Sequence, residues 1–130
     1  MKQEDKDLLL KDLCGRLPYG VKVNFNNIHI LRLGTHTRVG EYVTDVIEPC
    51  KPYLFPLSSM TDEQLYELRE MFGFEIEFRD GSIELSTFHH NCLGYLEMVS
   101  LFEWFNMNHF DYRRLISKGL AIDCTNLNIY

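Results

Sequence analysis

Three clusters of polar side chains have residue types and spacings that could carry chemistry. The first is the run His89-His90-Asn91-Cys92, where imidazole and thiolate groups could hold a metal ion or pair a nucleophile with a base. Adjacent side chains in a loop point apart, and no second set of ligands accompanies this run. We therefore expect it to be structural, with a metal-dependent hydrolase at His89, His90 and Cys92 as an alternative.

The second cluster is acidic and lies on a predicted hairpin. An Asp-Gly pair separates two alternating runs, which is the strongest short-range signal for a two-residue turn. The resulting register places Glu77 opposite Glu84, with Glu75 nearby. Like charges opposed across a hairpin favour a compensating cation, which Arg79, a divalent metal or a basic partner would supply. A solvated outer face is the simpler interpretation, because exposed charges interact weakly in water.

The third cluster lies near the C-terminus and consists of His109, Asp111, Tyr112, Arg113 and Arg114. The pattern predicts a helix beginning at Asp111, and two arginines beside its N-terminus could bind an anion such as a nucleotide phosphate. In the structural alternative, Asp111 is only a helix cap, Tyr112 packs against the proline-containing segment around Tyr53, and the arginines neutralise nearby acidic residues.

The elements that must position these clusters form an α+β fold, which we expect to be one domain over residues 1–130. Hydrophobic periodicity predicts helices at 4–16, 61–72, 93–106 and 111–118, strands at 20–25, 28–33 and 42–47, a hairpin at 74–79 and 82–86, and a loose strand at 126–130. The N-terminal helix and three short antiparallel strands resemble the opening of a small SH3-like or Sm-like barrel.

A proline-containing segment, 49–60, divides the helix and strands of 1–48 from the helix, hairpin and helices of 61–130. Its prolines fix φ and remove backbone donors, so we expect an extended strap docked on a surface rather than a central strand. The strap ends at a clear helix start, where Thr61 and Gln64 have the spacing of a capping box.

The net charge of −6 is unevenly distributed along the 130 residues. Residues 1–48 balance seven basic against seven acidic side chains, whereas residues 49–130 carry six against twelve. An acidic C-terminal half disfavours binding to a nucleic-acid backbone, which requires clustered lysine and arginine. It suits solubility or a basic partner.

Cysteine spacing and hydropathy indicate the cellular compartment that we expect for this protein. The four cysteines, at positions 14, 50, 92 and 124, form no CxxC pair and match no zinc-site spacing. The charged N-terminus does not resemble a signal peptide, and no apolar run reaches membrane-spanning length. We therefore expect a cytoplasmic protein with reduced thiols, no cofactor and no membrane contact.

Three segments, Leu17–Val21, Lys51–Thr61 and His109–Ala121, make up about a quarter of the chain. Together with the Asn-Leu-Asn-Ile-Tyr tail, they resemble in sequence and order a group of small proteins encoded in phages and prophages of gut bacteria. Position 114 departs from that pattern, in which a small residue often follows the Tyr-Arg pair. The resemblance implies an accessory protein of a mobile element, acting in a bacterial host, and it transfers no catalytic residues.

These observations favour a non-enzymatic binding protein that contacts a host protein or a small ligand. The candidate contact residues are Tyr53, Tyr112 and Arg113, with the face of Glu75, Glu77 and Glu84 as an alternative patch. From another class, the chain could be a counter-defence protein that sequesters a nucleotide signal through Arg113, Arg114 and a helix N-terminus. The oligomeric state stays open, a homo-oligomer included.

Overall fold

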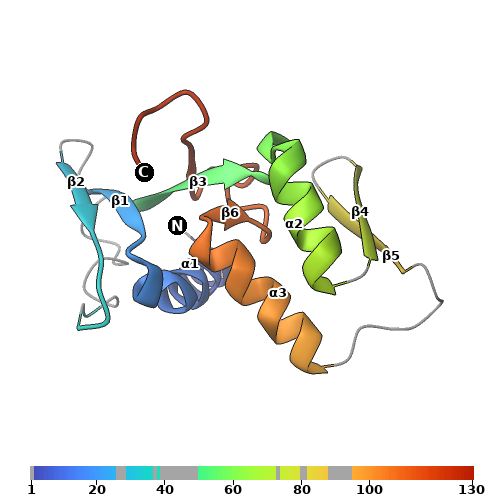
Figure 1. The fold of residues 1–130 in the computed structure, drawn as a ribbon. Coiled ribbons are helices and arrows are strands. Elements are labelled where there is room, and N and C mark those ends of the chain that lie inside the picture. The colour runs from blue at the N-terminus through green and yellow to red at the C-terminus, as the bar shows by residue number, and fades with distance from the viewer. Residues whose placement is uncertain are drawn as a thin grey trace.

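The computed structural model describes residues 2–25, 29–36, 38, 50–72, 74–79, 82–87 and 95–130, with the backbone alone at 29, 72, 74–79, 82–87 and 95–97. Within these ranges the chain forms three α-helices, a mixed open sheet of five strands and a separate two-stranded hairpin (Figure 1). The predicted α+β class is confirmed. Among the described strands, the sheet does not close into a barrel.

The N-terminal helix α1 spans Gln3–Arg16, close to the predicted bounds. Acidic residues in its first turn complement the positive end of the helix dipole. The buried positions Leu9, Asp12, Leu13 and Arg16 recur at the three- and four-residue spacing of one helix face. This face therefore carries two leucines and one oppositely charged pair into the interior.

A short 3-10 helix, η1 (Leu17–Tyr19), leads from α1 into the first strands. It ends at Gly20, which has a φ of 66° and lies so close to the Arg32 side chain that a Cβ there would collide with the guanidinium. β1 (Lys22–Phe25) and β2 (His29–Arg32) then pair antiparallel, as their alternation predicts. The predicted third strand at 42–47 lies outside the described residues.

The proline-containing segment contradicts the expected strap, because it forms the central strand β3 (Lys51–Pro56). β3 pairs antiparallel with β1 and parallel with two short strands, β6 (Phe110–Asp111) and β7 (Ile122–Asp123). Figure 1 shows β3 crossing the molecule from the β1–β2 pair to the start of α2. Every other strand of the sheet except β2 is therefore hydrogen-bonded directly to β3.

β3 tolerates its prolines because its ladders are short and use groups that proline does not remove. Each of its three pairings covers only two residue pairs. The Phe55 amide donates to the His109 carbonyl at 2.8 Å, and the Leu54 carbonyl accepts the Cys124 amide at 3.0 Å. The general rule against proline in a central strand thus fails here, since neither proline has to donate.

A second 3-10 helix, η3 (Leu57–Ser59), connects β3 to α2 (Asp62–Phe72). The predicted capping box is confirmed at the start of α2. The Thr61 hydroxyl accepts the Gln64 amide at 3.2 Å, and the Gln64 side-chain carbonyl accepts the Thr61 amide at 2.9 Å.

The predicted hairpin is also confirmed, with strands β4 (Phe74–Arg79) and β5 (Ser82–Thr87). Its register runs from Arg79 opposite Ser82 to Phe74 opposite Thr87, and it places Glu77 opposite Glu84 as predicted. Two independent signals in the sequence, the turn residues and the hydrophobic alternation, require this same register.

The C-terminal region follows the prediction only in part. Helix α3 (Tyr95–Met107) lies where one was expected, but the predicted helix at 111–118 is replaced by consecutive turns. The reason is a left-handed backbone at Arg114, with φ of 61°, which ends any right-handed helix begun at Asp111. The predicted strand at 126–130 is a loop that returns to the sheet through Tyr130.

The described side chains form two buried apolar clusters. The first packs α1 against β1 and β3 and includes Leu9, Leu13, Val21, Val23 and Leu54. The second is rich in aromatic rings, lies between α2, α3 and β6, and includes Leu68, Leu101, Trp104, Phe105 and Phe110. Much of the chain's aromatic content is therefore used in packing.

Candidate functional site

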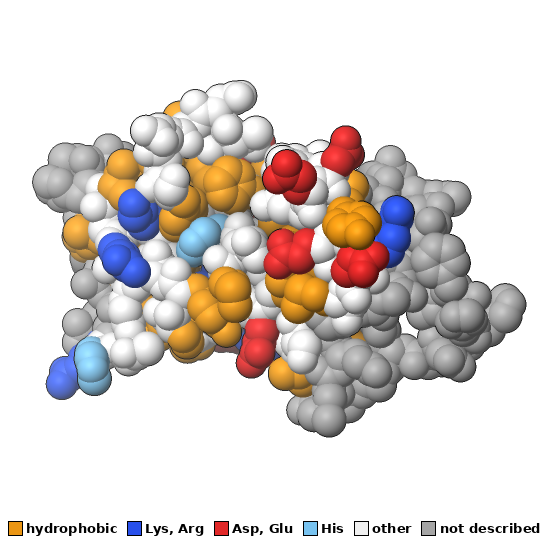
Figure 2. Space-filling model, viewed as in Figure 1, with side chains coloured by type: hydrophobic (Ala, Val, Ile, Leu, Met, Phe, Trp, Pro, Cys, Tyr) orange, Lys and Arg blue, Asp and Glu red, His pale blue; other side chains and the backbone are white. Residues whose placement is uncertain are grey.

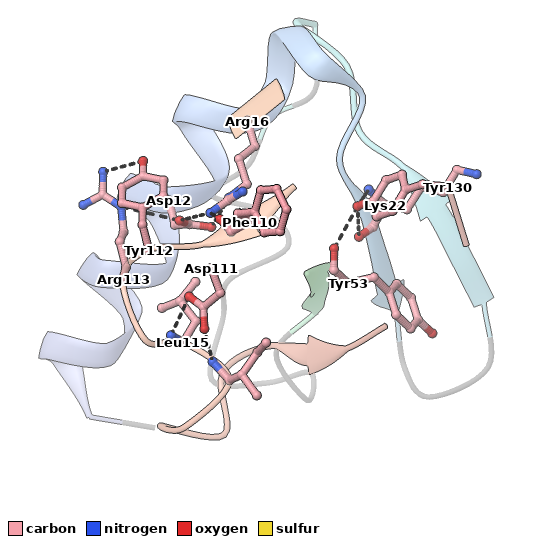
Figure 3. Close-up of polar contacts among 11 residues, drawn as sticks. Asp12, Arg16, Lys22, Tyr53, Phe110, Asp111, Tyr112, Arg113, Leu115 and Tyr130 are labelled. Carbon is pink, nitrogen blue, oxygen red and sulfur yellow. Dashed lines mark hydrogen bonds and ion pairs between the residues drawn. The ribbon is translucent and has the colours of Figure 1, made fainter. Parts of the chain in front are cut away.

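The third predicted cluster, around Asp111, is turned into the protein. Asp111 is only 6% exposed, and its two carboxylate oxygens accept the amides of Leu115 and Ile116, each at 2.9 Å (Figure 3). It acts as a cap, as one of the two interpretations expected, but of a turn rather than a helix. These two amides are consequently occupied by an internal carboxylate, which leaves them unable to bind an external anion.

Asp12 is the centre of a buried ion-pair network that the sequence did not reveal. Its carboxylate accepts hydrogen bonds from Nε of Arg16 at 2.7 Å and from Nη2 of Arg16 at 3.1 Å, and both side chains are fully buried. Arg16 also donates to the Phe110 carbonyl at 2.6 Å, which ties α1 to β6 (Figure 3). Arg113 approaches the same carboxylate at 3.4 Å with a side chain 24% exposed.

Tyr112 lies between this network and α3. Its ring stacks on Phe102 and Phe105, with centroid distances of 5.1 and 5.7 Å. The guanidinium groups of Arg16 and Arg113 lie 5.3 and 5.0 Å from the ring centroid, within cation–π range. Tyr112 therefore stacks on rings of α3, and it also packs against the apolar cluster that includes Leu57 and Met60 of the proline-containing segment. Arg113 neutralises an aspartate of α1.

Arg114 points to a different place from Arg113. It lines an open cleft of about 360 Å³ together with Pro56, Leu57, Ser58, Asp111, Ile116 and Ser117. The structure thus does not bring the two arginines together on one anion. It places one in the Asp12 network and the other at the cleft.

Tyr53 is buried, and a second tyrosine, Tyr130, docks beside it. The Tyr53 hydroxyl accepts a hydrogen bond from Nδ2 of Asn24 at 3.1 Å. The Tyr130 hydroxyl accepts the Lys22 amide at 2.9 Å and donates to the Tyr53 carbonyl at 2.9 Å (Figure 3). Although Tyr130 is 40% exposed, this hydroxyl sits between two strands, and burial raises its pKa to about 12.

His109 stacks on Tyr130 with a centroid distance of 3.6 Å and an interplanar angle of 9°. Its backbone is left-handed, with φ of 62°. Burial and, to a smaller extent, the positive charges of Arg16, Lys22 and Arg32 together lower the pKa of His109 to about 4. The imidazole is therefore neutral at pH 7 and serves as a flat packing surface.

The remaining predicted residues are only partly described. Glu75, Glu77 and Glu84 are placed by the backbone register of the hairpin, which brings Glu77 and Glu84 opposite each other. The run of His89, His90 and Cys92 lies outside the described residues. In the described part of the chain, no three metal-binding side chains cluster together. Burial also raises the thiol pKa values of Cys50 and Cys124 to about 11, so both stay protonated.

The outer face of α2 is the exposed counterpart of these buried clusters. Tyr66 is 62% exposed, and Asp62, Glu63 and Glu70 lie three or four positions away, which places them around it on the helix surface. We call these four residues the acidic face. Figure 2 shows carboxylates gathered around apolar side chains over α2. A signal was present in the sequence, since Tyr66 falls off the buried stripe of Leu65 and Leu68.

No family model, no curated protein and no solved structure matches this chain. None of the described helices is long and apolar enough to cross a membrane. Function must therefore be inferred from the geometry of the surfaces described above.

Proposed function

We propose that this chain is a non-enzymatic binding protein that recognises a basic protein partner through the acidic face of α2. The observation that supports the proposal best is the exposure of Tyr66, 62%, with the exposed carboxylates Asp62, Glu63 and Glu70 beside it on the helix surface and Arg69 at the remaining neighbouring position. Tyrosine is enriched among the residues that dominate protein interfaces, because it offers a large rigid ring and a polar tip. The surrounding carboxylates would select and orient a partner that presents lysine or arginine.

The contrast with the residues at 109–113 supports this assignment. Asp111 and Arg113, both candidates for ligand binding, are engaged with Leu115, Ile116 and Asp12 inside the protein. A partner could reach them only by breaking those contacts. The three carboxylates of the acidic face are already exposed, so a partner can use them with little rearrangement.

The resemblance to phage-encoded proteins would place the partner in a bacterial host. In that setting the chain would be an accessory protein of a mobile element, acting on a host protein in the cytoplasm. This assignment stays a prediction, as do the nucleotide-sequestering and metal-hydrolase alternatives.

The proposal is tested by a pull-down from bacterial lysate with the wild-type chain and two variants. Tyr66→Ala removes the aromatic anchor, and Glu70→Lys reverses one charge near the C-terminal end of α2, where a lysine suits the helix dipole. We expect a specific partner to be retained by the wild-type chain and its recovery to fall at least about tenfold with either variant. Both variants should unfold within about 0.5 kcal/mol of wild type, because neither side chain is buried.

Two matched variants control for unspecific effects. Ile30→Ala removes another exposed apolar side chain, 54% exposed and located on β2, and Asp7→Lys reverses an exposed charge on α1. Neither should reduce recovery. Retention of the same proteins by all five chains, or by none, would refute binding through the acidic face.

A further inference from the structure

The junction of β1 and β3 encloses a tyrosine side chain between backbone groups and aromatic rings. We call it the tyrosine slot and define it by the Lys22 amide, the Tyr53 carbonyl and the rings of Phe55 and His109. Tyr130 fills it in this structure. The ring stacks on His109 at 3.6 Å and lies 6.0 Å from the Phe55 centroid, while its hydroxyl meets both backbone groups at 2.9 Å.

The hydroxyl bridges β1 and β3 at the position where the next pair of backbone hydrogen bonds between them would lie. β1 and β3 pair at Asn24–Lys51 and Val23–Pro52, so the next residue pair in this register would be Lys22 and Tyr53. There the strands are bridged by the Tyr130 hydroxyl, which accepts from one strand and donates to the other. A ring without a hydroxyl would leave a backbone donor and a backbone acceptor without partners, so the slot selects tyrosine over phenylalanine.

Little else holds the tail that delivers this side chain. Residues 125–128 are exposed, and Leu127 is 47% exposed. Two further hydrogen bonds join this segment to the sheet, and both involve Lys22: its Nζ donates to the Ile129 carbonyl at 2.6 Å, and its carbonyl accepts from the Tyr130 hydroxyl at 3.5 Å. The segment is thus hydrogen-bonded to the sheet through Ile129 and Tyr130, and none of residues 125–130 belongs to either apolar cluster.

We propose that the tyrosine slot is a recognition site that the tail of a second copy of this chain can fill in trans. The same segment in a second copy offers the same ring, hydroxyl and Ile129 carbonyl, so exchange preserves each contact that the tail makes in cis. The proposal is independent of the acidic face, which lies on α2.

The first test uses an amidated peptide with the sequence of residues 126–130, Asn-Leu-Asn-Ile-Tyr, as a stand-in for the tail of a second copy. The receptor is the full chain with Tyr130→Ala, which empties the slot. We expect saturable binding, with an NMR shift of the Lys22 amide, and about tenfold weaker binding of the peptide ending in phenylalanine. The wild-type chain should bind more weakly than Tyr130→Ala, because its slot is occupied.

Three results of this test would overturn the slot as a recognition site: no binding to the emptied chain, equal binding of both peptides, or equal binding to the wild-type chain. If Tyr130→Ala fails to fold, Tyr130→Phe replaces it. That variant keeps the ring but not the hydroxyl. The tyrosine peptide should therefore displace residue 130 from the slot more readily in Tyr130→Phe than in the wild-type chain.

The second test asks whether a second copy is the occupant. Native mass spectrometry over a concentration series should show a dimer of the wild-type chain that the Tyr130→Ala chain does not form, and addition of the tyrosine peptide should dissociate it. A wild-type chain that stays monomeric throughout, or a dimer that persists in Tyr130→Ala, would overturn exchange between copies even if the peptide binds.

Discussion

The segment around Asp111 and the outer face of α2 are both rich in charged and aromatic residues, but the molecule uses them in opposite ways. In the first, Asp111 and Arg113 are engaged by partners from α1 and the following turns. In the second, Tyr66 and its neighbouring carboxylates face solvent. Residue type alone does not separate a structural polar cluster from a surface that is free to bind; the elements packed against it do.

The two regions also differ in energetic role. Asp12 and Arg16 are fully buried, so each charge depends on the other for most of its compensation, with the Phe110 carbonyl and Arg113 as further partners. The carboxylates of α2 keep their hydration and contribute little to folding. Substitutions in the first region should therefore change stability, and those in the second should change binding.

The largest expected effect is the loss of the carboxylate at the centre of the buried network. Asp12→Ala leaves Arg16 buried without its counter-charge, and we expect the free energy of unfolding to fall by about 3–5 kcal/mol. Urea denaturation measures this change. Asp7→Ala, on the exposed side of the same helix, is the control and should cost less than about 0.5 kcal/mol. Similar losses for the two variants would remove the distinction between the regions.

An intermediate effect should appear as a pH dependence of stability. Burial, together with nearby cations, holds the pKa of His109 at about 4, below the value of 6.5 for an unperturbed histidine. Between these values the unfolded chain binds the proton more readily, so stability contributed by neutral His109 is complete above pH 6.5 and is lost as pH falls towards 4. We expect a loss on the order of 2–3 kcal/mol across this window.

The variant His109→Asn isolates that contribution, because asparagine accepts a left-handed backbone but does not titrate. Its unfolding free energy should vary less between pH 6.5 and pH 4 than that of the wild-type chain, measured by urea denaturation at each pH. Identical pH profiles would assign the acid sensitivity to the carboxylates instead.

The smallest of these effects concerns the helix that carries the acidic face. Thr61→Ala removes the hydroxyl that caps α2 and should cost about 1 kcal/mol of unfolding free energy. Thr61→Ser keeps the hydroxyl and should cost much less. If stability does not differ between the two variants, the capping box contributes nothing measurable, and the packing of Leu68 alone positions the face.

Local signals in the sequence were sufficient for several elements. The hairpin register follows from the turn residues and the alternation around them, and the start of α2 follows from Thr61 and Gln64. The first helix follows from its leucine spacing. Each of these features depends on residues within a few positions of one another, where propensity and periodicity carry information.

The candidate site was much less accessible to the sequence. Asp111 was recognised as a cap and Arg113 and Arg114 as candidates. That the two arginines have different neighbours, Asp12 for one and the cleft for the other, accompanies a left-handed backbone at Arg114 that the sequence did not indicate. The partner of Arg113, Asp12, is about a hundred residues away in the chain. No periodicity or spacing predicts such a pair, because the contact exists only after α1 packs against β6.

Sequence by itself therefore determined the α+β class, the capped helix α2, the hairpin and the acidic bias that the outer face of α2 displays. Only the tertiary structure decided that the proline-containing segment is the central strand, that Asp12 and Arg16 are buried together, and that Tyr130 completes the junction of β1 and β3. The physical reason is how far apart in the sequence the interacting residues lie. A cap or a tight turn is selected by its immediate neighbours, whereas a strand's position and a buried charge's partner depend on which distant segments share the same core.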